Sequence, residues 1–161
     1  MADEQLRLRA LALCHEAYQA QMNGDLERAI KLYSQSLEVM PTAEAYTFRG
    51  WAYSYMGRID DAVAECHKAI AIDPDFGNPY NDIGAYLMAK GELDEAIEWL
   101  ERAKQAPRYE PRHFPFMNLG RVYEAKGMVL KAIEEFEGAL RFEPDNLPCR
   151  RKVAELRAML N

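Results

Sequence analysis

The sequence predicts an all-α protein, a right-handed solenoid of antiparallel helix pairs. Glycines recur along the chain at intervals of 33, 34 and 36 residues, at Gly24, Gly57, Gly91 and Gly127. Alanines keep the same intervals, at Ala29, Ala62, Ala96 and Ala132. Apolar residues on both sides of each glycine repeat at steps of three and four, the spacing of an amphipathic helix. A fixed period in the mid-thirties is typical of stacked two-helix units with an extended binding surface.

Four such units and a last helix are expected within one domain, residues 1–161. Each unit consists of a helix, a glycine turn, a second helix and, in most cases, a proline that ends it. Gly57 is expected in a left-handed conformation at the end of a first helix, and Pro74 stops the second helix of the same unit. The expected units cover residues about 10–41, 43–76, 77–106 and 113–146, and the last helix covers residues about 148–160.

Small residues stand in the middle of every first helix, at Ala17, Gly50, Gly84 and Gly120. Glycine inside a helix costs about 1 kcal/mol relative to alanine. We therefore expect the two helices of a unit to approach closely there, with the repeated alanines opposite. Large aromatic side chains should fill the space between units, namely Tyr33, Tyr123 and Phe136.

The last helix lacks the partner helix that would complete a fifth unit, so it is expected to act as a cap. Val153, Leu156 and Leu160 are spaced to cover the open apolar side of the fourth unit. Its arginines are expected to meet water, as a terminal solenoid element requires.

One irregular stretch, QAPRYEPRHFP, joins the third and fourth units and accounts for the 36-residue step. It carries three prolines and replaces a tight turn with a longer connection over residues 107–115. Two interpretations stay open: a tolerated loop insertion, or a contact surface built from Arg108, Tyr109, Arg112 and His113.

Composition argues against several classes of function. The formal net charge of -6 disfavours nucleic acid as the main ligand, because phosphate binding needs a broad cationic face. The three cysteines and three histidines are scattered, without the spacing of a disulfide framework or a metal site. No catalytic motif, membrane-length apolar run or secretory signal is present. We expect a cytoplasmic, non-enzymatic protein without cofactor or metal.

The fourth unit carries a leucine, glycine, tyrosine, glycine, alanine, aromatic, alanine and proline series at Leu119, Gly120, Tyr123, Gly127, Ala132, Phe136, Ala139 and Pro144. This pattern resembles the tetratricopeptide repeat (TPR) family, and the resemblance extends over nearly the whole chain. The first unit departs most, with Ala17 in place of the first glycine and Ser36 in place of the last alanine. The resemblance implies a superhelix whose first helices line a concave groove that binds protein.

Carrying the family's groove positions over to this chain gives a surface rich in aromatic and thioether side chains. Such side chains are enriched in interface cores, so the implied ligand is a protein segment or helix with apolar anchors. The alternative is that several of them pack between neighbouring first helices. The candidate groove residues are Tyr18, Met22, Phe48, Trp51, Tyr55, Asn81, Met88, Phe114, Met117 and Arg121.

A well-known branch of the family grips the terminal carboxylates of chaperone tails with lysine, asparagine and arginine side chains. The matching places here hold Cys14, Tyr18, Phe48, Asn78 and Asp82. Because these residues supply no cation, binding to such tails is disfavoured.

Three hypotheses about function follow. The first is an adaptor that holds a partner segment in the groove, with Trp51 and Tyr55 as central anchors. The second is a self-associating assembly protein, a homo-oligomer in which the groove or an exposed end takes up another copy. The third is a secretion or pilus-biogenesis chaperone, since the insert at residues 107–115 is similar to junctions in some bacterial members of the family.

Overall fold

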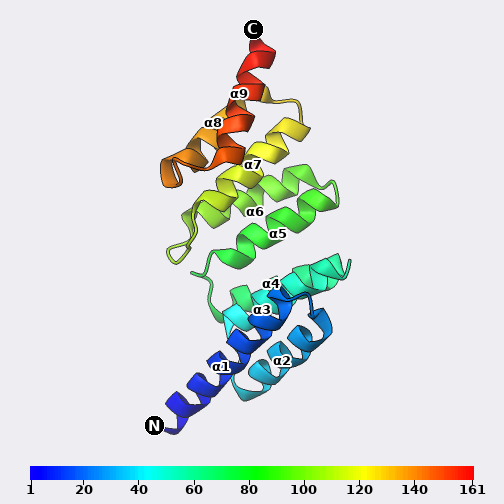
Figure 1. The fold of residues 1–161 in the computed structure, drawn as a ribbon, viewed down its shortest axis with the longest axis vertical. Coiled ribbons are helices and arrows are strands. Elements are labelled where there is room, and N and C mark those ends of the chain that lie inside the picture. The colour runs from blue at the N-terminus through cyan, green and yellow to red at the C-terminus, as the bar shows by residue number, and fades with distance from the viewer.

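The protein is a stack of helix pairs with no β-sheet. The computed structural model describes all residues 1–161, and Figure 1 shows the pairs following one another in chain order between the two termini. The expected all-α solenoid is confirmed. The helices are α1 (Ala2–Met22), α2 (Leu26–Val39), α3 (Ala43–Tyr55), α4 (Ile59–Ile72), α5 (Asn78–Ala89), α6 (Leu93–Gln105), α7 (His113–Ala125), α8 (Val129–Phe142) and α9 (Leu147–Leu160).

The first helix is longer than expected, since α1 begins at Ala2 rather than near Ala10. Residues 1–9 are all exposed, and Ala10 is the first buried position of the chain. The repeat pattern therefore starts only where α1 meets a partner. The preceding turns are helical because they consist of good helix formers such as alanine, leucine, arginine and glutamine.

The turn inside each pair contains the repeated glycine in a left-handed conformation. The φ angles are 82°, 78°, 78° and 73° at Gly24, Gly57, Gly91 and Gly127. Residues with a Cβ atom disfavour these φ values, which explains why glycine recurs at this position in every unit. The conformation expected for Gly57 is confirmed.

Close approach within the pairs is confirmed at the mid-helix glycines. A Cβ added at Gly50 would lie 3.0 Å from the backbone oxygen of Ala62 and 3.1 Å from the Glu65 Cβ. At Gly84 the corresponding atom would lie 2.5 Å from the Leu100 side chain. At Gly120 of α7 the nearest side chain is the ring of Phe136 in α8, so an alanine of the facing helix lies nearest only at Gly50.

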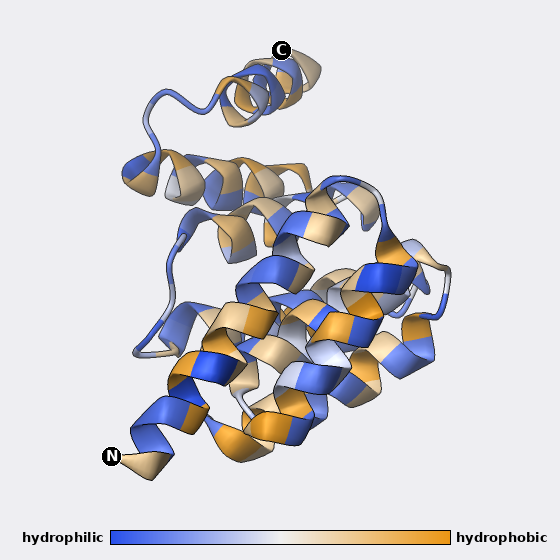
Figure 2. Cartoon of the chain, turned by 60° about the horizontal axis from the view of Figure 1, so that its bottom comes forward, coloured by the Kyte–Doolittle hydropathy of each residue, from blue (hydrophilic) through white to orange (hydrophobic).

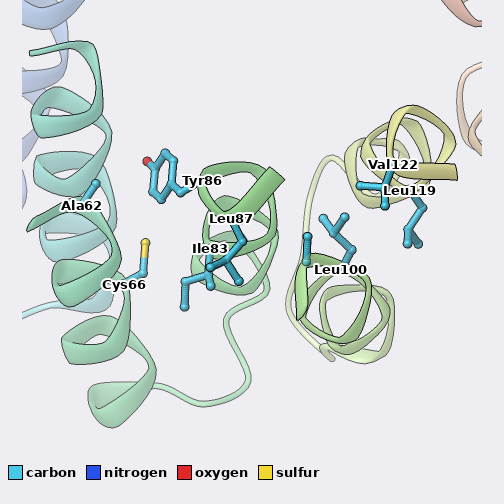
Figure 3. Close-up of a cluster of buried hydrophobic side chains, with 9 residues drawn as sticks. Ala62, Cys66, Ile83, Tyr86, Leu87, Leu100, Leu119 and Val122 are labelled. Carbon is cyan, nitrogen blue, oxygen red and sulfur yellow. The ribbon is translucent and has the colours of Figure 1, made fainter. Parts of the chain in front are cut away.

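The core runs continuously through the stack rather than ending at each pair. Figure 3 shows Cys66 of α4, Tyr86 of α5, Leu100 of α6 and Leu119 of α7 in one cluster of buried side chains. Neighbouring pairs are thus joined by shared apolar contacts, as in other solenoids.

The last helix, α9, covers the fourth pair as a cap, with one correction. Val153 and Leu156 are buried against it, whereas Leu160 is 52% exposed because it lies in the final turn, beyond α8. The helix starts at Leu147, where the Asn146 side chain accepts a hydrogen bond from the Cys149 amide and caps it.

Polar and apolar residues are mixed along every helix in Figure 2. None of the helices combines the length and the apolar character needed to cross a membrane.

The first helices of neighbouring pairs lie side by side. Contacts join α1 to α3, α3 to α5 and α5 to α7, and no comparable contacts join consecutive second helices. The first helices are therefore on the inner side of the stack.

Candidate peptide-binding groove

The inner face of the stack, formed by α1, α3, α5 and α7, is called the groove below. Two hollows on it adjoin at Phe48, which lines both. The N-terminal hollow, about 320 Å³, is lined by Leu11, Cys14, His15, Tyr18, Glu44 and Phe48. The central hollow, about 260 Å³, is lined by Phe48, Trp51, Asn78, Asn81, Asp82, Tyr109, Pro111 and Phe114.

A third hollow, about 280 Å³, lies between α7 and α9 and includes Met117 and Arg121. A larger hollow, about 470 Å³, lies beside Tyr80 and Arg102, and only two of its seven lining residues are hydrophobic. It therefore offers little to apolar anchors, and the groove is the better candidate site.

Aromatic rings are grouped along the groove. The Tyr18 and Phe48 rings are 5.8 Å apart between centroids, and the Trp51 and Tyr55 rings are 5.5 Å apart. Tyr18, Tyr55 and Phe114 remain 37%, 62% and 44% exposed. Exposed aromatic surface of this kind, set in hollows, is typical of protein-binding sites.

The irregular stretch between the third and fourth units folds back into the groove. The Gly77 amide donates a hydrogen bond to the Arg108 carbonyl at 3.0 Å, and the Arg108 amide donates to the Asp75 carbonyl at 3.0 Å. The segment thereby pairs with the connection between α4 and α5, which is the preceding junction between units. Tyr109 and Pro111 line the central hollow as a result.

Sequence reasoning did not assign Tyr109 and Pro111 to the groove. A local signal existed in Gly77, the residue just before α5. A Cβ there would lie 2.6 Å from the Cβ and Cγ atoms of Tyr109. Only glycine lets the tyrosine ring lie against the backbone at this point.

The four residues for which a contact surface was one interpretation of this stretch all make contacts within the chain, and two of them are buried. Arg108 pairs with Glu44 at 3.1 Å and also with Asp73. Tyr109 and His113 are 3% and 6% exposed. The Arg112 guanidinium donates hydrogen bonds to the carbonyls of Ala106 and Pro107.

A polar ladder connects α5 to α7 on the floor of the groove. The Asn118 amide donates to the Asn81 Oδ1 at 3.0 Å, and Arg121 donates to the Asn118 Oδ1 at 3.1 Å. Asn81 and Asn118 are both 7% exposed. These hydrogen bonds fix the positions of the two asparagine side chains. Arg121, the last member of the series, is exposed to solvent.

Asp82 is the electrostatic exception in the groove. Burial raises the pKa of its carboxyl to about 7, although a hydrogen bond with Asn81 acts in the opposite direction. No cation contributes to this shift. Two other carboxylates of the groove are paired, Glu44 with Arg108 and Glu124 with Lys152.

The ten candidate groove residues differ in how much surface they offer. Met22 is 51% exposed and Arg121 is exposed, while Phe48, Trp51 and Met88 are partly buried. Asn81 and Met117 are more than nine-tenths buried. Met117 packs in the cluster of α8 and α9 side chains that includes Phe136 and Cys149, so it presents little free surface. The role of the set in binding stays a prediction.

No group of three or more histidine, cysteine, aspartate or glutamate side chains comes together in an arrangement that could hold a metal ion.

Family models match the chain in three places. Models of the tetratricopeptide repeat match residues 43–76, 80–106 and 116–146, which together make up more than half of the chain. The first helix pair, whose sequence departs most from the pattern, is outside these matches.

A known protein with tetratricopeptide repeats is similar to part of this chain. Residues of this chain are 34% identical over 97 positions to the small glutamine-rich tetratricopeptide repeat-containing protein 2 of Saccharomyces cerevisiae. The match covers 60% of this chain and 28% of the yeast protein. The chain thus spans little more than a quarter of that relative's length.

Two solved structures share the arrangement of helices. Pseudomonas aeruginosa PilF superimposes with a TM-score of 0.87 at 25% identity, over 97% of this chain and 69% of that one. PilW, described as a widely conserved type IV pilus biogenesis factor, superimposes with a TM-score of 0.84 at 20% identity, over 93% and 69% of the two chains. The likeness to PilW concerns the fold alone.

Proposed function

This chain belongs to the tetratricopeptide repeat family, and from that premise we propose that it is a non-enzymatic adaptor that holds a segment of a partner protein in its groove. The observation that carries the proposal is the pair of hollows that adjoin at Phe48. Together they extend across α1, α3, α5 and α7, with aromatic side chains from α1, α3 and α7 and polar side chains from α5. A peptide or helix with apolar anchors fits such a surface.

The aromatic side chains give the groove its expected affinity. Trp51 lies in the central hollow against Tyr55, and Tyr18 lies in the N-terminal hollow against Phe48. Tryptophan and tyrosine dominate the energetics of protein interfaces when they fill pockets near the centre. We therefore place the main anchors of the partner in these two hollows.

The charge of the groove disfavours one class of partner. A carboxylate-terminated tail needs cations, and the matching positions hold Cys14, Tyr18, Phe48, Asn78 and Asp82. The proposed partner is therefore an internal segment or helix rather than an acidic chain end. The proposal includes a cytoplasmic location, with which three free, buried cysteines are compatible.

Affinity capture from a lysate of the source organism tests the proposal. The bait is the full chain, compared with Trp51→Ala and with a matched control, Phe142→Ala, which removes an exposed aromatic ring from α8, a second helix. Proteins that bind the wild type and the control but not Trp51→Ala are groove partners. For a purified partner, Trp51→Ala should weaken binding by about 2 kcal/mol or more, roughly 30-fold. Equal binding by a folded Trp51→Ala variant would contradict the groove assignment.

Light scattering over a concentration series checks the self-association alternative. A stable dimer that is lost in Trp51→Ala would mean that the groove takes up a second copy of this chain. A monomer with Trp51 accessible to a fluorescence quencher supports the adaptor.

A second candidate function is a role in pilus assembly. What supports it is the likeness to PilF over nearly the whole chain, together with the insert at residues 107–115. Deletion of the gene in its source organism, followed by counting of surface pili in electron micrographs, tests this candidate. Loss of pili that is restored by the wild type but not by Trp51→Ala would support it, and normal pili in the deletion strain would refute it.

A further inference from the structure

We propose that the central hollow receives a basic side chain of the partner segment, lysine or arginine, with the Asp82 carboxylate as its counter-ion. This inference rests on the proposed function and names the chemistry of one subsite. It adds a charged requirement to the aromatic surface of the groove.

Asp82 differs from two other groove carboxylates in its ion pairing. Glu44 has a cationic partner in Arg108 at 3.1 Å, and Glu124 has one in Lys152 at 2.8 Å. Asp82 has none, although it is partly buried at the floor of the central hollow. A buried charge without a counter-ion is costly, and a ligand cation would relieve that cost. The net charge of -6 also favours the approach of a basic partner.

Aromatic side chains form the walls of the hollow that Asp82 lines. They are Phe48, Trp51, Tyr109 and Phe114. Aromatic faces attract ammonium and guanidinium groups, and they also pack against the methylene stem of lysine or arginine. A hollow with aromatic walls and one carboxylate is therefore complementary to a long basic side chain.

A second hydrogen-bond acceptor, the Asn78 side chain, lies on the same helix as Asp82. Asn78 precedes Asp82 by four residues on α5, so both lie on the same face of the helix. The Asn78 Oδ1 is buried and accepts no hydrogen bond. An ammonium group has three donors and a guanidinium has five, which suits two acceptors in one hollow.

The groups that face Asp82 leave its charge uncompensated. They are Cys66 on α4, Tyr86 on α5 and Tyr109 in the folded-back stretch. Burial raises the pKa of each of these groups, with Asp82 as a further cause, so all three are neutral near pH 7. Because the pKa of Asp82 itself is raised to about 7, a basic ligand should bind better above neutral pH than below it.

Selection from a peptide library tests the subsite. The probe is a set of capped, histidine-free peptides of about nine residues, each pool carrying one fixed residue at one position. The full chain is compared with Asp82→Asn and with Glu98→Gln, which removes the same charge from an exposed position on the second helix α6. We expect the wild type and Glu98→Gln to retain lysine or arginine pools about tenfold over the matching norleucine pools. Asp82→Asn should lose this preference and keep the preference for apolar anchors.

The outcomes separate this inference from the proposed function. If the wild type selects peptides with apolar anchors but shows no preference for lysine or arginine at any position, the inference is overturned and the proposed adaptor function is not. Pools retained no better by the wild type than by Trp51→Ala would overturn both. A basic preference that survives in Asp82→Asn would also overturn the inference.

The pH dependence of binding gives a second readout, measured by fluorescence anisotropy with the best lysine or arginine peptide. Between about pH 5.5 and about pH 8 the affinity of the wild type should rise about tenfold, and that of Asp82→Asn should stay constant. A constant affinity for the wild type would exclude Asp82 as the counter-ion.

Discussion

Arg49 and Glu65 form a two-pronged ion pair between the facing helices α3 and α4. The Arg49 Nε lies 2.7 Å from the Glu65 Oε2, and the Nη2 lies 3.0 Å from the Oε1. The two side chains are only 16% and 5% exposed. A pair of parallel, charge-assisted hydrogen bonds at this depth fixes the relative position of the two helices.

Removing only the arginine should therefore be costly. In Arg49→Ala the Glu65 carboxylate stays buried, with Lys68 at 3.0 Å, an exposed side chain, as its remaining partner. We expect the free energy of unfolding to fall by about 3 kcal/mol, measured by urea denaturation.

The matched control replaces both partners. Arg49→Met combined with Glu65→Leu fills the space with apolar atoms and leaves no buried unpaired charge, since Lys68 is exposed to solvent, so it should recover most of the lost stability. If the double variant were as unstable as the single one, packing rather than the unpaired carboxylate would account for the loss.

The unpaired Asp82 should lower stability above neutral pH. Its folded-state pKa of about 7 exceeds its ordinary value of 3.8. Between these values the folded state keeps a proton that the unfolded state has released, so stability falls as pH rises, by about 1.4 kcal/mol per pH unit for this one proton. Asp82→Asn removes the penalty. The variant should match the wild type at about pH 4 and exceed it by at most about 4 kcal/mol at about pH 8.

Thermal unfolding across this pH range measures the difference between the two proteins. Comparing differences cancels the contributions of all other titrating groups. A gap that does not widen from low to high pH would mean that Asp82 titrates at an ordinary value.

Sequence reasoning succeeds where the signal is local and periodic. The glycines at the turns need positive φ, and Gly50 and Gly84 need room beside a facing helix. The turn glycine recurs in all four repeats, and the mid-helix position holds glycine in three repeats and alanine, Ala17, in the first, so a single sequence shows both requirements. The exposed start of α1 carries no such requirement, because residues 1–9 meet no partner helix.

The composition of the groove was only partly accessible from the sequence. The resemblance to the family placed Met117 on the groove side, but α9 packs there and buries it to 8% exposure. Tyr109 and Pro111 enter the central hollow because residues 107–109 pair with residues 75–77. That pairing joins segments about thirty residues apart and leaves no periodic trace, so only the three-dimensional structure reveals it.

Arg108 should hold the folded-back stretch in place without contributing much to global stability. Its guanidinium pairs with Glu44 and Asp73 and lies 4.4 Å from the centre of the Phe76 ring. Pairs as exposed as these contribute about 1 kcal/mol or less. We expect Arg108→Ala to unfold at nearly the wild-type urea concentration, while amide hydrogen exchange at Gly77 becomes faster, because the Arg108 carbonyl that accepts its hydrogen bond is no longer fixed.

The Asp73 carboxyl reports on the same contact. The hydrogen bond from Arg108 is the largest cause that lowers the pKa of Asp73, so Arg108→Ala should raise that pKa, and Arg108→Lys should raise it less. Titration followed by NMR measures the change. A pKa of Asp73 that is unaffected by either variant would place the guanidinium elsewhere in solution.

Gly77→Ala should disturb the groove through Tyr109. The new Cβ would lie 2.6 Å from the Tyr109 Cβ, which is fixed to the backbone, so rotation of the side chain cannot relieve the contact. Residues 107–112 must then shift, which moves Tyr109 and Pro111 out of the central hollow. We expect a loss of about 1–3 kcal/mol in stability, as for other overpacked sites, together with weaker binding of any ligand of that hollow.

The matched control is Gly57→Ala, where the added atom meets open space but the φ of 78° strains the turn. The control should lose about 1–2 kcal/mol of stability and keep its affinity. Equal affinity in both variants would mean that Tyr109 and Pro111 do not shape the ligand site.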